Sequence, residues 1–523
     1  MNIDNLRVLA AGHPLQKRLD HLLRFLWDPL MYETKVDGTR VFSSIARDDI
    51  AQMMKDGTMR PLSKTQAKKV RRWAKFFTVY EAKKHRRRGI VWPRQVNDEV
   101  DYDCDIHLHS LLEQMLQMKS GDTAAAFDFT AGFHQFELGE EVRPYFSILT
   151  SDDEAYEFLR GLMGFRPMAE LMDVTTKILA TSTVLRKEHI DVRINTHIDN
   201  VRFLGTPDAV TRASQRFTEN CAFVNATINS ESQNELHRAG EYCGVVYDYE
   251  HGTTAVPSHM LDKLDAYYQE FCDSPTFETA SAFFGVLFHV SAVLRAPLHA
   301  YYHVIKWYRK TMSRATTERI TGAEGVRFWE SARPQLEGWL RFVKANTPVT
   351  RNRTSATEIR LFTDASSTGW GALLFPGDGT MRVVAGRWSP LDASRDISEQ
   401  EAMAVTNAVS AFMEWLRGAA FQLHVDNTSL LWAVAKGYAR AWNLNKRVTE
   451  LKAILDPLAA TYSVHYVRSA ENPADGPSRG FSPARITQLA SPLGSRVGGL
   501  DGSLLPKRRS YSEVVRKNEK VRG

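Results

Sequence analysis

EIRLFTDASSTGWGALLF, residues 358–375, has the pattern of two β-strands joined by a tight turn. Asp364 falls at the end of the first predicted strand. Further along, FQLHVDN (421–427) alternates apolar and polar residues, so Asp426 also falls at a strand end. Both acids therefore lie where a folded sheet can present them to a ligand.

Two more acids belong to this part of the chain. Glu401 opens a predicted helix with apolar residues at three- and four-residue spacing, and Asp475 lies in a proline-bounded turn or helix start. Clustered carboxylates suit Mg²⁺, a hard ion that prefers oxygen ligands. Two such ions about 3.5–4 Å apart activate water and stabilise the leaving 3′ oxygen of a phosphodiester. The four acids together predict a two-metal nuclease site, although any one alone would be a helix cap or a turn former.

A second pair of acids lies upstream. AAAFDFTAGFHQFEL (124–138) places Asp128 on a predicted buried strand. RINTHIDNVRFLG (193–205) predicts a β-hairpin with Asp199 at its tip. An acid on a central strand and an acid at a hairpin tip can hold the metal pair for nucleotidyl transfer, in which a 3′ hydroxyl attacks an α-phosphate. The alternative is a pair of turn-forming aspartates.

The composition is that of a globular protein with several domains. The chain has 523 residues, 43% of them hydrophobic, and a net charge of +6. Residues 64–94 are rich in Lys and Arg with aromatics between them, which predicts either a solvated helix face or a nucleic-acid contact. The 4 cysteines form no CxxC pair, and no segment resembles a signal peptide or a membrane span. We therefore expect an intracellular protein, cytoplasmic or nuclear, without a disulfide framework or a zinc ribbon.

The C-terminal motifs resemble ribonuclease H. TDASSTGWGALL, GRWSP followed by ISEQEAMAV, HVDNTS and ENPADGPSR match that family in order and at similar separations. The resemblance is strongest to the ribonuclease H of DIRS-like tyrosine-recombinase retrotransposons, and weaker to gypsy-like elements. The loop before Asn472 lacks the histidine that cellular ribonucleases H carry there, which implies an altered rate.

The upstream motifs resemble those of reverse transcriptases. The segments around Asp128 and Asp199 are similar to polymerase motifs A and C, and RGLMGFRPMAEL is similar to motif B, with Gly164 beside template and nucleotide. RRRGIVWPRQVN resembles the fingers strand whose arginine, here Arg88, grips the triphosphate. Phe133 stands at the steric-gate position, which implies a preference for deoxynucleotides. CAFVNATINSES and EYCGVVYDYEHG are similar to motif D and to motif E, the primer grip.

Motif C departs from the family. The usual Tyr-x-Asp-Asp is His197-Ile198-Asp199-Asn200 here, so the second ligand offers a neutral carbonyl oxygen and no charge. Pro167 also stands closer to Gly164 than in most relatives. Both variations resemble the trypanosomatid VIPER-type branch of DIRS-like elements.

The resemblance implies an α+β polymerase right hand of fingers, palm and thumb, followed by an α/β ribonuclease H-like domain with a mixed five-stranded sheet. The predicted domains are an N-terminal helical extension (1–44), fingers and palm (45–255), a helical thumb and tether (256–346), a linker (347–358), a ribonuclease H domain (359–480) and a basic tail (481–523).

The expected cofactors are two Mg²⁺ or Mn²⁺ ions in each active site. The expected metal ligands are Asp128, the Phe129 carbonyl, Asp199 and Asn200 in the polymerase, and Asp364, Glu401, Asp426 and Asp475 in the nuclease. The expected partners are an RNA template, a DNA primer, RNA–DNA hybrid and deoxynucleoside triphosphates, without a membrane, and the Gag-like and recombinase proteins of the same element. The alternatives are a non-catalytic nucleic-acid-binding relic and a nuclease with a decayed polymerase site. Asn200 favours them, and the intact set of nuclease acids argues against the relic.

Overall fold

The chain forms two compact units. The computed structural model describes residues 1–32, 39–81, 86–182, 191–229, 236–318, 320–351, 359–458 and 460–480. The first unit comprises Met1–Ala296, Met312–Arg327 and Glu337–Asn352, and the second comprises Pro297–Thr311, Phe328–Leu336 and Arg353–Gly523. The predicted basic tail (481–523) and most of the predicted linker lie outside the described residues.

A three-stranded antiparallel sheet lies at the centre of the first unit. Its strands are β5 (Thr123–Asp128), β9 (Asn200–Gly205) and β8 (Val192–His197), in that order. Helices α7 (Arg166–Ala180) and α9 (Pro207–Phe223) pack against it because their apolar faces meet the buried residues of the strands. This packing fixes the ends of β5 and of the β8–β9 hairpin, which carry the predicted polymerase acids.

The described residues of the first unit form three further sheets, two with four strands and one with two. Their strands, in sheet order, are β1 (Phe42–Ser43), β6 (Ser147–Thr150), β7 (Ala155–Phe158) and β2 (Met59–Pro61); β3 (Lys75–Glu81) and β4 (Arg86–Trp92); and β10 (Ala239–Tyr242), β11 (Val245–Asp248), β12 (Thr253–Ala255) and β13 (Val349–Thr350). The described part of the basic block at 64–94 is therefore mainly the antiparallel strand pair β3–β4 and not a helix face. Strand β13 comes from the segment predicted as a linker, where Arg351 is buried and donates to Thr254 Oγ1 at 2.9 Å.

Helices make up the rest of the first unit and the segments that alternate between units. They are α1 (Ile3–Ala10), α2 (Gln16–Arg24), α3 (Arg47–Lys55), α4 (Lys64–Ala67), α5 (Arg94–Glu99), α6 (Leu111–Leu116), α10 (Ser258–Asp273), α11 (Phe277–Val293), α12 (Tyr302–Thr317) and α13 (Arg333–Lys344). Helices α1 and α2 contact α7, so the predicted N-terminal extension packs on the central sheet's helical layer. The predicted thumb region is divided, because 297–311 and 328–336 cluster with the second unit.

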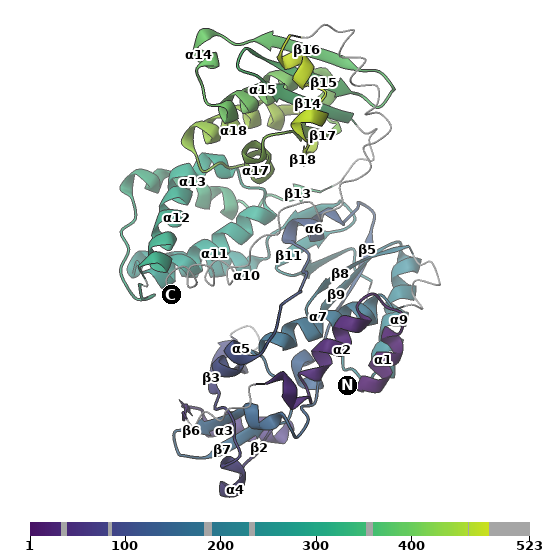
Figure 1. Cartoon of the computed structure of the whole chain (residues 1–523), viewed down its shortest axis with the longest axis vertical. Helices are drawn as coiled ribbons and strands as arrows, with labels where there is room; N and C mark the ends of the chain where they lie inside the picture. Colours follow the sequence, from purple (N-terminus) through teal and green to yellow (C-terminus); the bar gives the residue numbers. More distant parts are fainter. Residues whose placement is uncertain are drawn as a thin grey trace. The chain divides into compact units, whose positions relative to one another are not determined.

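The second unit contains a mixed five-stranded sheet in the order β16-β15-β14-β17-β18 (Figure 1). Strands β14 (Ile359–Ala365), β15 (Gly369–Phe375) and β16 (Arg382–Arg387) are antiparallel, whereas β17 (Ala420–Val425) and β18 (Thr461–Tyr466) continue the sheet in parallel from β14. The helices of the unit are α14 (Pro390–Ala393), α15 (Ile397–Ala411), α16 (Met413–Leu416), α17 (Thr428–Lys436), α18 (Trp442–Leu455) and α19 (Asp475–Ser478). The sheet is mixed and five-stranded, as the resemblance to ribonuclease H implied.

Helix α15 begins earlier than predicted. Asp396 caps its first turn by accepting from Ser398 N, so Glu401 lies inside the helix and not at its start. The predicted apolar stripe, which includes Ala402, Val405 and Val409, is buried against β14 and β15. Because this stripe fixes the rotation of the helix, it also fixes the direction of Glu401.

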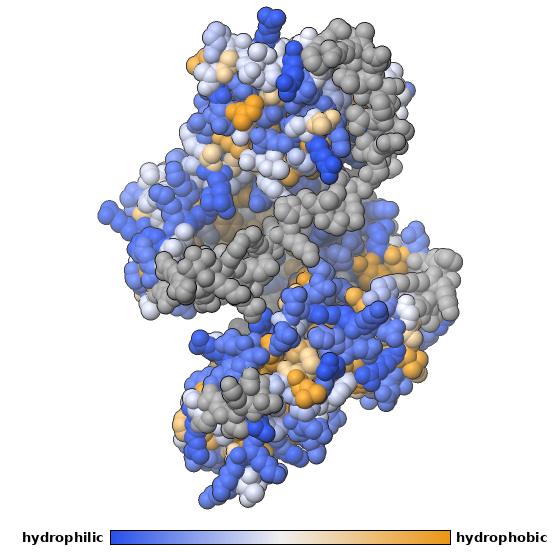
Figure 2. Space-filling model, in the orientation of Figure 1, coloured by the Kyte–Doolittle hydropathy of each residue, from blue (hydrophilic) through white to orange (hydrophobic). Residues whose placement is uncertain are grey.

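Most of the visible surface is hydrophilic, with small scattered hydrophobic areas (Figure 2). Within the described ranges, no helix has the length and apolar character needed to cross a membrane.

Candidate active sites

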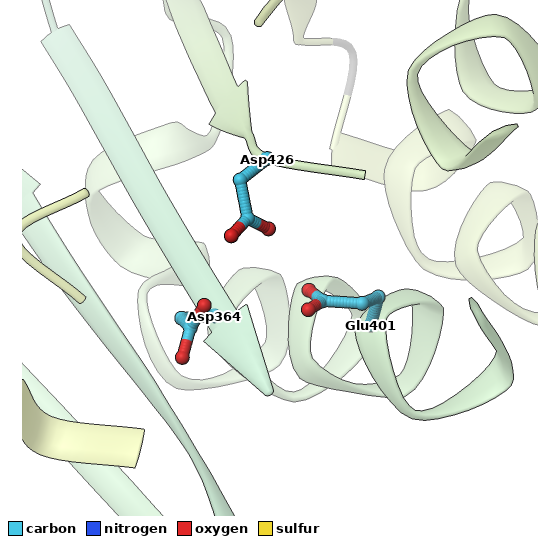
Figure 3. A group of neighbouring side chains, drawn as sticks. All are labelled: Asp364, Glu401 and Asp426. Carbon is cyan, nitrogen blue, oxygen red and sulfur yellow. The ribbon is translucent and has the colours of Figure 1, made fainter. Parts of the chain in front are cut away.

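Three carboxylates converge at one end of the five-stranded sheet (Figure 3). Asp364 lies near the end of β14, Asp426 directly follows the parallel neighbour β17, and Glu401 extends from α15. One oxygen from each lies within 4.8 Å of the other two. Parallel strands end at the same edge of a sheet, which explains why two acids far apart in the sequence meet here.

The fourth predicted acid, Asp475, lies beside this group and is not part of it. Its carboxylate contributes to the electrostatic environment of Asp364, but Oδ1 is bound by Arg479, with Nε and Nη2 each at 2.8 Å. Asp475 begins α19, the last described helix. The position of Asp475 therefore depends on how α19 is held.

Helix α19 rests directly on β15 because two strand residues have no side chain. A Cβ on Gly371 would lie 2.5 Å from Ser478 N and 2.5 Å from Pro477 Cβ. At Gly369, Ser366 Oγ accepts from the glycine N–H and donates to Ser478 O at 2.8 Å. The GWG sequence thus allows backbone to pack against backbone and delivers Asp475 to the carboxylates.

Ser478 was not identified from the sequence as a site residue. It is buried, and its Oγ lies 2.5 Å from Asp364 Oδ2 and 2.9 Å from Asp475 O. Ser469, in the loop before Asn472, donates to Asp426 Oδ2 at 2.7 Å. Nothing in their spacing distinguishes these serines from surface serines, because each becomes a carboxylate partner only through the tertiary fold.

The electrostatics of the cluster suit a bound cation. Burial, reinforced by the charges of Asp426 and Asp364, raises the pKa of Glu401 from 4.5 to about 9. Burial raises the pKa of Asp364 to about 6, with repulsion from the other acids adding to this and Ser478 opposing it. Glu401 Oε2 is buried and has no hydrogen-bond partner among the described residues. A divalent cation would supply the missing partner and restore the ionised forms.

The two predicted polymerase acids are neighbours in the central sheet of the first unit. Asp128 ends β5 opposite Asn200 in β9, and Phe129 N donates to Asp199 O at 3.3 Å. Ile198, in the turn that carries Asp199, has a φ of +58°, which is unusual for a β-branched residue. Burial raises the pKa of Asp199, while the charge of Arg88 opposes this effect.

Asn200 contacts Asp199 through its amide. Asn200 Nδ2 lies 3.2 Å from Asp199 Oδ1 and acts as a donor in this arrangement. The Phe129 carbonyl lies on the segment that joins β5 to the 3-10 turn Gly132–Gln135. Within this turn, the position of a Gly132 Cβ lies 3.4 Å from Asp199 Cβ, so Phe133 follows a residue that packs on the hairpin tip.

Gly164 and Arg88 lie on two segments that touch. Gly164 has a φ of +110°, and a Cβ there would lie 2.0 Å from Val91 O in β4, so only glycine fits. Arg88, also in β4, has Nη1 4.0 Å from Met163 Sδ. Asn97 holds the segments together: its side chain donates to Gly164 O at 2.8 Å and accepts from Arg166 N at 3.0 Å. The resemblance to motif B identified Gly164, whereas no pattern in the sequence identified Asn97.

Part of the second unit matches a known protein family. Residues 354–457 match the family model of the RNase H-like domain found in reverse transcriptase. Asp364, Glu401 and Asp426 lie within the matched residues, and Asp475 lies beyond them. A comparison with curated protein sequences gives no match.

Most of the chain is similar in fold to a solved reverse transcriptase. A foamy viral protease-reverse transcriptase dRH in complex with double-stranded DNA has a TM-score of 0.50 and 12% identity, covering 90% of this chain and 82% of that chain. The same viral protein in complex with an RNA/DNA hybrid has a TM-score of 0.48 and 12% identity, with 90% and 63% coverage. Its complex with double-stranded DNA has a TM-score of 0.47 and 12% identity, covering 90% of this chain and 98% of that chain. By the first of these matches the chain resembles a solved reverse transcriptase in fold, and residues 354–457 match a ribonuclease H-like domain.

Proposed function

We propose that this chain is a retroelement reverse transcriptase that extends a DNA primer on RNA and DNA templates and cleaves RNA in RNA–DNA hybrids. The observation that carries the proposal is the convergence of Asp364, Glu401 and Asp426 in a domain of the reverse-transcriptase type. The neighbouring positions of Asp128 and Asp199 support a polymerase site in the first unit.

In the nuclease site, Asp364, Glu401, Asp426 and Asp475 would hold two Mg²⁺ or Mn²⁺ ions. When bound, these ions supply the charge that activates water and stabilises the leaving 3′ oxygen. Ser478 would orient Asp364 and Ser469 would orient Asp426, because each hydroxyl donates to one oxygen of its carboxylate. Arg479 does the same for Asp475. With a cation bound, Glu401 would be ionised, since its pKa of about 9 applies to the site without a cation.

In the polymerase site, Asp128, Asp199, the Phe129 carbonyl and Asn200 would hold the corresponding ions. Arg88 would bind the triphosphate, which explains why its charge lies near Asp199. Phe133 would exclude a ribose 2′-OH, and Gly164 would leave space for template and nucleotide. These roles assign a fingers, palm and thumb arrangement to the first unit and the helices that follow it.

The lineage we propose is that of DIRS-like elements of the trypanosomatid VIPER type, on the motifs around Asn200 and Pro167. Its partners would be an RNA template, a DNA primer and deoxynucleoside triphosphates, with Gag-like and recombinase proteins of the same element. The protein would act in the cytoplasm or the nucleus.

The test uses the full chain with Mg²⁺ or Mn²⁺ on two substrates. On an end-labelled RNA–DNA hybrid, Asp426→Asn is expected to abolish cleavage, and Asp378→Asn, in the β15–β16 turn, serves as the matched control. On a primed RNA template, Asp128→Asn is expected to abolish extension, and the exposed Asp208→Asn is the control. Equal activities of Asp426→Asn and wild type would refute the nuclease assignment.

Asn200 supports a second candidate, a nuclease without polymerase activity. Its amide donates to Asp199, so this position adds no negative charge to the hairpin tip. Hybrid cleavage without primer extension in the wild type would favour this candidate. Absence of both activities in the folded chain would favour a nucleic-acid-binding relic.

A further inference from the structure

A buried arginine lies three residues after Asp199, in the strand that leaves the hairpin tip. Arg202 is fully buried in β9, and it is among the largest side chains of the chain that are buried to this degree. None of the roles assigned above uses it.

The guanidinium of Arg202 contacts three other elements of the first unit. Nε and Nη2 donate to Asn195 Oδ1 in β8 at 3.1 and 2.5 Å, and Nη2 also donates to Gln114 O in α6 at 2.9 Å. Its Cζ lies 4.1 Å from the ring centroid of Tyr247 in β11 and 4.5 Å from that of Tyr242 in β10. Nε and Nη2 of the planar fork and the flat face of the cation are engaged, and a lysine could not reproduce this set of contacts.

Arg202 is stabilised without a carboxylate. Its partners among the described residues are neutral oxygens and aromatic rings, whereas Arg193 on the neighbouring strand forms an ion pair with Asp122. Burying an unpaired charge is costly unless hydrogen bonds and geometry compensate for it. An apolar side chain would fill the same space at lower cost, which indicates that the position serves something other than stability.

The contacts of Arg202 join two sheets at the hairpin tip. Asn195 belongs to the sheet that carries Asp128 and Asp199, and the two tyrosines belong to the β10-β11-β12-β13 sheet. The Tyr242 hydroxyl lies 3.4 Å from Asn195 O and 3.5 Å from Asn200 O, so the second sheet also touches the backbone beside Asp199. The β10–β11 hairpin therefore contacts both strands of the hairpin that carries Asp199.

We infer that Arg202 is a positioning residue that locks the β10–β11 hairpin to the β8–β9 hairpin and so sets the distance between the primer end and Asp199. The inference rests on the proposed polymerase function and on the resemblance of EYCGVVYDYEHG, which overlaps β10 and β11, to the primer grip. Arg202 and Tyr242 would then affect the rate of nucleotide addition. They would have little effect on primer–template affinity, because that affinity comes mainly from phosphate contacts elsewhere.

The experiment compares full-length wild type with Arg202→Met, Arg202→Lys, Tyr242→Phe and a control, Arg238→Gln, which removes an exposed arginine before β10. Single-turnover incorporation of one deoxynucleotide gives the rate at saturation, and a binding titration gives the Kd of the primer–template. We expect Arg202→Met to lower the rate by about 10- to 100-fold, since a misplacement of about 1 Å can cost 100-fold, while Kd changes less than about twofold. Arg202→Lys and Tyr242→Phe should show smaller losses of rate, and Arg238→Gln none.

A second measurement separates this inference from the polymerase proposal. Hydrogen exchange of peptides that cover 193–205 and 239–248 should show about tenfold faster exchange in Arg202→Met, with the five-stranded sheet unchanged. Wild-type rate in a folded Arg202→Met chain would overturn the inference, as would equal losses of rate and primer affinity. If Arg202→Met does not fold, Tyr242→Phe decides, because it retains the ring and loses only the hydroxyl beside Asn200. If the wild type does not extend primers, the polymerase proposal fails, and unchanged exchange in both hairpins would then refute the coupling by itself.

Discussion

Glu401→Gln is expected to stabilise the metal-free ribonuclease H-like domain at neutral pH and to remove the stabilisation that Mg²⁺ provides. The physical reason is the pKa of Glu401, which burial and the neighbouring acids raise from 4.5 to about 9. In the folded metal-free chain the carboxyl is protonated at pH 7, whereas in the unfolded chain it is ionised. Because the folded state binds more protons between these two pKa values, the free energy of unfolding falls as pH rises through this range.

The size of the effect follows from this difference in pKa. Each pH unit between 4.5 and the working pH lowers the free energy of unfolding by about 1.4 kcal/mol, which gives on the order of 3 kcal/mol at pH 7. Glutamine cannot ionise in either state, so Glu401→Gln recovers up to this amount at pH 7 and almost nothing near pH 4.5. Its amide can also donate to Asp364 or Asp426, which suits two acceptors within 4.8 Å of the site.

Hydrogen exchange in the full chain tests this prediction. Peptides that cover β14, α15 and β17 report the opening free energy of this domain, with and without saturating Mg²⁺, at several pH values. Glu414→Gln, an exposed acid in α16, is the control and should match the wild type throughout. The reasoning is refuted if Glu401→Gln is no more stable than wild type at pH 7 without Mg²⁺, or if its advantage does not grow with pH.

Three further predictions concern the contacts around the two candidate sites. Ser478→Ala removes the donor that lowers the pKa of Asp364, so that pKa rises above about 6, and the acidic limb of the pH profile for hybrid cleavage should move to higher pH. Gly371→Ala places a Cβ 2.5 Å from Ser478 N and should lower the free energy of unfolding of the domain by about 1–3 kcal/mol in chemical denaturation. The same change should reduce hybrid cleavage, and unchanged cleavage would contradict the packing of α19 on β15. Asn97→Ala leaves Gly164 O and Arg166 N without their partner and should cost about 1–3 kcal/mol, with weaker nucleotide binding in a filter or quench-flow titration and no change in hybrid cleavage.

The sequence alone determined the elements that carry the acids. Alternation of apolar residues predicts β14 and β17, and it places Asp364 and Asp426 at strand ends, because the two faces of a strand are read directly from a period of two. The same rule predicts the β8–β9 hairpin with Asp199 in its turn. These features depend on neighbouring residues in the chain, so local patterns are sufficient to predict them.

Only the tertiary structure decided which residues surround those acids. Helix α19 reaches Asp364 because Gly371 leaves space for its backbone, and that approach joins residues more than 100 positions apart. Strand β13 and the buried Arg351 come from a segment whose polarity predicts a linker. The segment is nevertheless packed, because the distant strand β12 supplies hydrogen bonds to its polar groups. Arg202 has the alternation of an ordinary strand residue, and its partners come from β8, α6, β10 and β11. Sequence periodicity identifies a strand and its faces, whereas the partners of a buried polar group are set by long-range packing, which no local pattern contains.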